Sequence, residues 1–174
     1  MLKLSDALLN VSVMSLRTGS SVGTATEMII NPNNLKVEGW HVSDRFDGKK
    51  LILLSNDVRD LAPQGLVIND HEVLAEEDEL VRLKKILEIN FQLIGKYVMS
   101  QSGKKYGKVS DYAVETDSMF VKKIYASQPI IKSFSGGSIS IDRTQIIEIT
   151  NTRIIIEDAT EKAGDVATST IAAS

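Results

Sequence analysis

Apolar and polar residues alternate along the first half of the chain with the period of two that is typical of half-buried β-strands. Val11, Val13 and Leu16 begin this pattern, and a turn at Gly19 leads into the next apolar run. Short strands joined by regular turns predict a small meandering β-barrel. After the first strand, the pattern predicts strands at 22–30, 37–42, 51–54 and 66–68.

The second half of the chain repeats this order of strands and turns. A Gly-x-x-x-Gly-x-(Ala/Val)-x-(Asp/Glu) pattern begins with Gly19 and Gly23 and returns, 84 positions later, with Gly103 and Gly107. Because glycine permits a positive φ or a close backbone approach, we expect structural turn roles for all four. One module is thus present twice. The strands expected in the second copy are 97–99, 107–115, 119–126, 139–141, 146–149 and 154–157.

Between the two copies the apolar period changes from two to that of a helix. Leucines at 80, 83 and 87 recur at helical spacing, and charged residues fill the other face of the expected helix. The pattern predicts an amphipathic linker helix over 76–94 that buries Leu80, Leu83 and Leu87. The expected domains are therefore a first barrel at 1–75, the linker, a second barrel at 95–158 and a flexible tail at 159–174, whose apolar content is low.

The overall composition is that of an ordinary soluble protein, with 43% hydrophobic and 25% charged residues. Valine and isoleucine are numerous among the apolar side chains, which favours strands. The chain has no cysteine, so disulfides and thiolate chemistry are excluded. The first residues do not resemble a signal peptide, and no window approaches about 18 uninterrupted apolar residues. We therefore expect a cytoplasmic protein without a membrane span.

The repeated glycine pattern, followed each time by short strands, resembles the PRC-barrel domain, a small β-barrel found in the photosynthetic reaction-centre H subunit and in a small-subunit ribosome maturation factor. The segment from Glu77 to Lys96 is similar to the linker of bacterial proteins that carry two such barrels. The resemblance covers about 10–158 and implies two PRC-type barrels in tandem. The chain lacks the membrane helix of the H subunit and the separate N-terminal domain of the maturation factor, so their particular functions are not implied.

Residues that could carry catalysis or bind a metal do not form a recognisable set. His41 and His71, the only two histidines, stand in separate settings. The acidic run 76–79 lacks the spacing of a calcium loop and suits a solvated helix start. The glycine–lysine segment 103–108 lacks the spacing and the hydroxyl of a phosphate loop. We therefore expect no enzymatic activity, no cofactor, no metal and no small-molecule substrate.

One charge asymmetry distinguishes the second copy from the first. Seven lysines and three acidic residues lie between Gly95 and Ser135, in a chain whose net charge is −3. A basic, tyrosine-containing patch would suit an acidic partner or phosphate groups. The alternative is that these lysines only solubilise exposed turns and edge strands. The candidate partner-binding residues are Lys104, Lys105, Tyr106, Lys108, Lys122, Lys123 and Tyr125.

Two classes of function follow from this pattern. The first is a non-catalytic binding or adaptor module that acts through protein–protein contacts with a partner not identified by the sequence. The alternative is an accessory factor in RNA processing or ribosome maturation, which would bind RNA or a ribosomal component through the basic patch. Salt-dependent affinity for RNA separates the two.

Overall fold

The computed structural model describes residues 1–128 and 137–158. Strands take up 52% and helices 17% of the structure, which contains two sheets, one of them curled into a half-barrel. The mainly β class that the alternation predicts is confirmed. The tail predicted at 159–174 lies outside the described residues.

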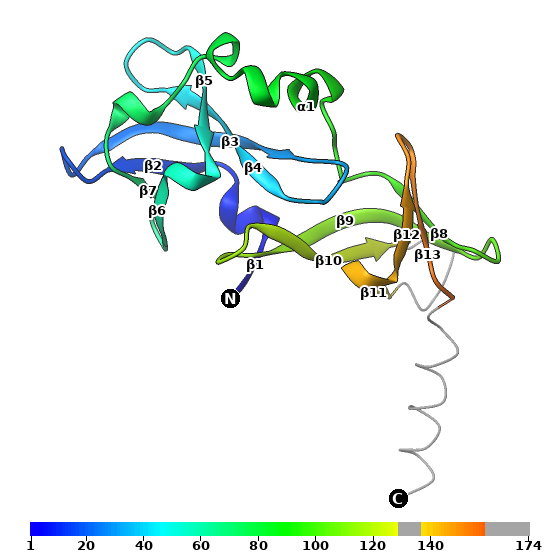
Figure 1. Cartoon of the computed structure of the whole chain (residues 1–174). Coiled ribbons are helices and arrows are strands. Elements are labelled where there is room, and N and C mark those ends of the chain that lie inside the picture. Colours follow the sequence, from blue (N-terminus) through cyan, green and yellow to red (C-terminus); the bar gives the residue numbers. More distant parts are fainter. Residues whose placement is uncertain (129–136, 159–174) are drawn as a thin grey trace, which may run out of the picture. The chain divides into compact units, whose positions relative to one another are not determined.

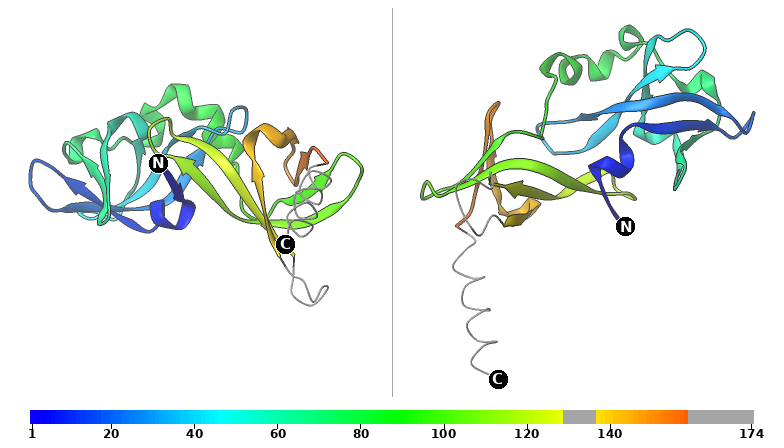
Figure 2. Two further views of the ribbon diagram at one scale, coloured as in Figure 1. Left: turned by 90° about the horizontal axis from the view of Figure 1, so that it is seen from below. Right: turned by 180° about the vertical axis from the view of Figure 1, so that it is seen from behind.

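The first sheet has six strands in the order β5-β4-β3-β2-β7-β6 (Figure 1). Strand β2 lies antiparallel to β3 and parallel to β7. Both views in Figure 2 show β2, β3 and β4 side by side in one curved layer. The strands are β2 (Val11–Ser15), β3 (Ser21–Ile30), β4 (Val37–Asp44), β5 (Lys50–Leu54), β6 (Val58–Ala62) and β7 (Gly65–Ile68).

The second sheet contains the order β11-β10-β9-β8-β13-β12, which is the order of the first sheet strand for strand. Here β8 lies antiparallel to β9 and parallel to β13. A short additional strand, β1 (Leu2–Leu4), pairs with the end of β9. The strands are β8 (Tyr97–Ser100), β9 (Lys105–Glu115), β10 (Phe120–Ser127), β11 (Ser138–Asp142), β12 (Ile146–Ile149) and β13 (Arg153–Ile156).

The chain forms two compact units. Unit 1 comprises Met1–Gln92 and Asp111–Lys122, so it includes the far end of the β9–β10 hairpin. Unit 2 comprises Leu93–Ser110 and the described residues from Lys123 onward. These units describe which residues pack together. The domain bounds expected from the sequence, 1–75, 76–94 and 95–158, describe a repeat and stay a prediction.

The core of unit 1 surrounds Trp40, the single tryptophan of the chain, which is fully buried. Its Nε1 donates a hydrogen bond to the carbonyl oxygen of Leu8 at 3.0 Å, so the one polar atom of the ring is satisfied. The hairpin end adds Tyr112, whose hydroxyl lies 3.9 Å from the Sδ atom of Met28. Unit 2 has a smaller core of branched side chains, which includes Leu93, Val98, Val109, Ile124, Ile141, Ile154 and Ile156.

The continuous helix expected over 76–94 is not what the chain forms. Short 3₁₀ helices at Glu77–Glu79 and Val81–Leu83 precede α1 (Lys84–Ile89). Leu80, with φ −100° and ψ 66°, interrupts the helical backbone between them. Leu83 is buried as expected, whereas Leu80 and Leu87 are only half-buried. The other 3₁₀ helices in the described part of the chain are Ser5–Leu8, Ser55–Asp57, His71–Val73 and Arg143–Gln145.

Candidate functional site

The outward face of the second sheet carries a row of three chemically distinctive side chains. Along β8, Val98 and Ser100 point into the core, so Tyr97 and Met99 lie on the opposite face. Tyr97 is directly opposite Lys108 of β9 and, on its other side, opposite Arg153 of β13. Residues opposite each other share a face of the sheet. An aromatic ring therefore stands between two cations.

A bulge in β9 brings a third cation to this face. Val98 pairs with Gly107, but Met99 pairs with Lys105, so Tyr106 is the extra residue of the bulge. In a regular strand two residues three positions apart point to opposite faces. Because of the bulge, Lys105 and Lys108 lie on the same face as the two outward side chains of β8.

These residues line a groove of about 1000 Å³ within unit 2, called here the Tyr97 groove. None of the described residues that line it carries a carboxylate, and the structure shows no ion pair for Lys105, Lys108 or Arg153 among the described residues. The Lys108 ammonium lies 4.9 Å from the centre of the Tyr97 ring, a cation–π contact. The lining residues are Tyr97, Val98, Met99, Lys105, Gly107, Lys108, Ser127, Gln128, Thr152 and Arg153.

Gly107 is the position in the groove where the backbone leaves no room for a side chain. Its φ of +96° is unfavourable for other residues, and a Cβ atom there would lie 2.2 Å from the carbonyl oxygen of Ser127. Gly23, 84 positions earlier, is similarly confined, because a Cβ atom would lie 2.7 Å from the carbonyl oxygen of Ser43. Gly19 and Gly103, by contrast, have positive φ values in open turns.

The structure separates the seven residues that the sequence singled out. Lys105 and Lys108 line the Tyr97 groove. Lys104 is exposed, with its ammonium 5.3 Å from the ring centre of Tyr106. The Tyr106 side chain itself is only 6% exposed, so its ring is not available for stacking on a partner.

The other three predicted residues lie on β10. Lys122 is exposed and belongs to unit 1, with its ammonium 6.0 Å from the ring centre of Phe120. Lys123 and Tyr125 belong to unit 2 and are half-buried. None of these three lines the Tyr97 groove.

Sequence reasoning missed Tyr97, Met99 and Arg153, which complete the groove. The alternation in β8 was a usable signal, because it places Tyr97 and Met99 on one face. Arg153 could not be found this way, since the parallel pairing of β8 with β13 joins segments far apart in the chain.

The corresponding face of the first sheet lacks these groups. There Ser12 stands opposite Thr24 and Gly65, in place of Tyr97, Lys108 and Arg153. Gly65 cannot be replaced by an arginine without a backbone shift, because a Cβ atom there would lie 2.0 Å from the carbonyl oxygen of Ser12. The cationic and aromatic row is thus a property of the second sheet.

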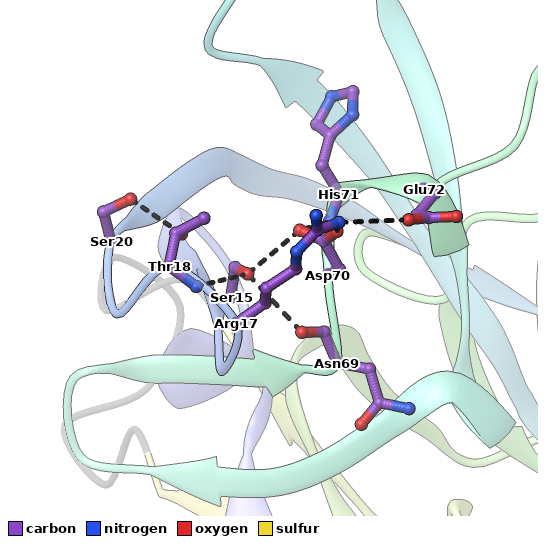
Figure 3. A network of polar contacts seen from close by, with 8 residues as sticks. All are labelled: Ser15, Arg17, Thr18, Ser20, Asn69, Asp70, His71 and Glu72. Carbon is purple, nitrogen blue, oxygen red and sulfur yellow. Dashed lines mark hydrogen bonds and ion pairs between the residues drawn. The ribbon is translucent and has the colours of Figure 1, made fainter.

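A polar network lies at the rim of unit 1 (Figure 3). Arg17 Nη1 lies 2.7 Å from Asp70 and 3.4 Å from Glu72, and the Ser15 hydroxyl donates to Asp70 at 3.2 Å. The hydrogen bond from Arg17, followed by that from the backbone N–H of His71, lowers the pKa of Asp70. The charged groups of this network form ion pairs with one another and so connect the ends of the strands. We therefore assign the network a structural role.

The second copy contains a matching serine–aspartate pair. Asp158 follows β13 as Asp70 follows β7, and Ser100 ends β8 as Ser15 ends β2. Hydrogen bonds from the hydroxyls of Ser100 and Ser102 lower the pKa of Asp158, and the Ser102 hydroxyl lies 2.6 Å from its Oδ1 atom. These pairs join the first strand of each copy to the end of the last.

The described residues contain no group of three or more histidine, aspartate and glutamate side chains placed to hold a metal ion. Among them there is likewise no helix long and apolar enough to cross a membrane. A comparison of the sequence with protein-family models finds no match. A comparison with the curated proteins finds none either.

Proposed function

We propose that this chain is a non-catalytic binding or adaptor module of the cytoplasm, acts through protein–protein contacts and uses the Tyr97 groove as its contact surface. The single observation that carries the proposal is the row Lys108–Tyr97–Arg153, three large side chains on one open face without a neutralising carboxylate among the described residues. Such a row is of little use to the fold, because its charges face solvent and Tyr97 is 57% exposed.

The chemistry of the groove supports binding rather than catalysis. Those of its lining side chains that the structure describes include lysine, arginine, tyrosine and hydroxyl groups, but no histidine, carboxylate or cysteine that could accept a proton near neutral pH. The two histidines of the chain lie in unit 1, in separate settings.

We further propose that the chain consists of two PRC-type barrels in tandem, of which the second has become the binding barrel. The identical strand orders, the parallel pairings β2–β7 and β8–β13, and the two serine–aspartate pairs support a duplicated module. In the first sheet the corresponding residues, Ser12, Thr24 and Gly65, are uncharged. This difference supports a binding role for the second barrel and a structural role for the first.

An accessory role in RNA metabolism is the second candidate function. The observation in its favour is the exposed Tyr97 ring between two cations, because aromatic stacking next to phosphate contacts is how single strands are bound without sequence preference. Under this proposal RNA or a ribosomal component would occupy the same groove.

Site-specific photo-crosslinking in cells that express the full chain tests the proposed function. A benzophenone amino acid replaces Tyr97 in one variant and Phe46 of unit 1, which is also exposed, in a matched control. We expect the benzophenone at position 97 to form a crosslink with a defined protein. Lys105→Glu combined with Lys108→Glu should abolish that crosslinked product. Equal products from both positions, or products that survive the charge reversal, would exclude the groove as the contact surface.

A further inference from the structure

We infer that the Tyr97 groove recognises an acidic peptide segment that contains an apolar side chain. The inference rests on the proposed function and specifies the chemistry of the partner. It follows from three properties of the groove, which are the charge of its rim, the apolar character of its floor and the small number of its aromatic rings.

The cations of the groove are placed to meet several carboxylates at once. Lys105, Lys108 and Arg153 come from two strands on either side of β8, so they border the outward side chains of β8 from both sides. The guanidinium of Arg153 can bind both oxygens of one carboxylate, and the ammonium groups can each meet another. No described carboxylate in the groove competes with such a ligand.

The floor of the groove can bury an apolar side chain of the partner. Met99 is half-buried and stands opposite Ile155 on β13, while Tyr97 exposes most of its ring. Methionine adapts its shape to the side chain that packs on it, and the loss of exposed apolar surface would favour binding.

The same properties favour a peptide over a nucleic acid strand. Single strands without sequence preference are bound by successive stacked aromatics along a basic track. The residues lining this groove include one aromatic, Tyr97, and the Lys108 ammonium already lies over its ring.

Fluorescence anisotropy with the full chain and short labelled peptides tests the inference. The probe is an extended peptide with aspartates and glutamates on both sides of a Leu-Phe pair. One comparison peptide carries asparagine and glutamine in place of the acids, a second carries serine in place of Leu-Phe, and a single-stranded oligouridylate tests the nucleic acid. We expect the acidic, apolar peptide to bind most tightly and both comparison peptides to bind at least several-fold more weakly.

Variants of the protein locate the site. Lys108→Gln and Arg153→Gln should each lower the affinity for the acidic peptide by about two- to fivefold, the range for exposed ion pairs. Lys49→Gln and Lys50→Gln, exposed in unit 1, should leave its affinity unchanged. Tyr97→Ser should remove the advantage of Leu-Phe over serine while keeping the preference for acids. Circular dichroism melting curves verify that each variant is folded.

Three results would overturn the inference. They are equal binding of the amide peptide, tighter binding of oligouridylate, and an affinity that Lys108→Gln and Arg153→Gln leave unchanged. Each is distinguishable from failure of the proposed function. If the benzophenone at position 97 crosslinks one protein in cells while the acidic peptide does not bind, the groove is a contact surface and its partner is not acidic.

Discussion

The Nε2 atom of His71 lies 2.6 Å from the Oδ1 atom of Asp44, and Asp44 is only 5% exposed. The aspartate also accepts a hydrogen bond from the backbone N–H of Asp47 at 3.2 Å, and the rings of His71 and Phe46 meet in a T-shaped arrangement with their centres 5.2 Å apart. Burial, the largest influence, acts to raise the pKa of Asp44, but the hydrogen bonds from His71 and Asp47 together outweigh it and lower the pKa. A nearly buried carboxylate thus stays charged and ties β4 to the segment after β7.

This arrangement predicts a pH-dependent contribution to the stability of unit 1. Because the pKa of Asp44 in the folded chain lies below its ordinary value of 3.8, its contribution is complete above that value and is lost as the pH falls through the folded pKa. Asp44→Asn should lower the free energy of unfolding by about 1 to 3 kcal/mol at neutral pH. The difference from the parent should shrink at about pH 3.

Urea unfolding followed by the fluorescence of Trp40 measures this difference, since the ring is buried in unit 1. Ser15→Ala, which removes one neutral hydroxyl of the nearby rim network, serves as a control without a change of charge. A gap between Asp44→Asn and the parent that stays constant with pH would show that the charge of Asp44 contributes nothing.

The segment before α1 predicts a contrast between two neighbouring residues. Leu83 is 9% exposed and Val81 is 79% exposed, although both belong to the same 3₁₀ helix. Leu83→Asp should cost several kcal/mol, about 3 or more, because it buries an unpaired charge. Val81→Asp should change stability by less than about 0.5 kcal/mol. Similar unfolding curves for the two variants, recorded by Trp40 fluorescence, would mean that this segment is not docked.

Two glycines of unit 2 allow backbone strain to be separated from steric conflict. Gly103 and Gly107 have similar φ values, +88° and +96°, but only Gly107 has an atom within reach of an added Cβ. Gly103→Ala should cost about 1 to 2 kcal/mol, the penalty of the left-handed region alone. Gly107→Ala should cost clearly more, because the β9 backbone must move away from Ser127. Urea unfolding followed by circular dichroism compares them, and equal losses would show that the strand yields without penalty.

The contrast between Tyr106 and Tyr97 shows how far sequence patterns reach in this protein. Alternation and turn residues predict most strands of both copies, because a half-buried strand must place apolar side chains at every second position. The lysine-rich segment suggests an exposed Tyr106, yet the bulge in β9 turns this ring into the core. Tyr97, which the alternation in β8 places on the outward face, is the exposed ring instead. A bulge depends on the pairing of two strands, so the local sequence does not reveal it. Arg153 reaches the site through a parallel pairing, which is also non-local.

The final prediction concerns RNA. It separates the Tyr97 groove from the wider lysine set, defined here as the predicted lysines that do not line the groove, Lys104, Lys122 and Lys123. The logarithm of an affinity for single-stranded nucleic acid falls with the logarithm of the salt concentration, with a slope of about −0.7 for each phosphate contact. If oligouridylate enters only the groove, it meets Lys105, Lys108 and Arg153. The slope should then be no steeper than about −2.

Titrations of the labelled oligonucleotide at several salt concentrations measure this slope. Arg153→Gln should flatten it by about 0.7, because one phosphate contact is lost. Lys104→Gln and Lys122→Gln, which change lysines outside the groove, should leave it unaltered. A steeper slope that Lys104→Gln or Lys122→Gln flattens would mean that RNA follows the wider lysine set. The RNA role would then rest on the patch that the sequence suggested, and the groove would be left to the protein partner.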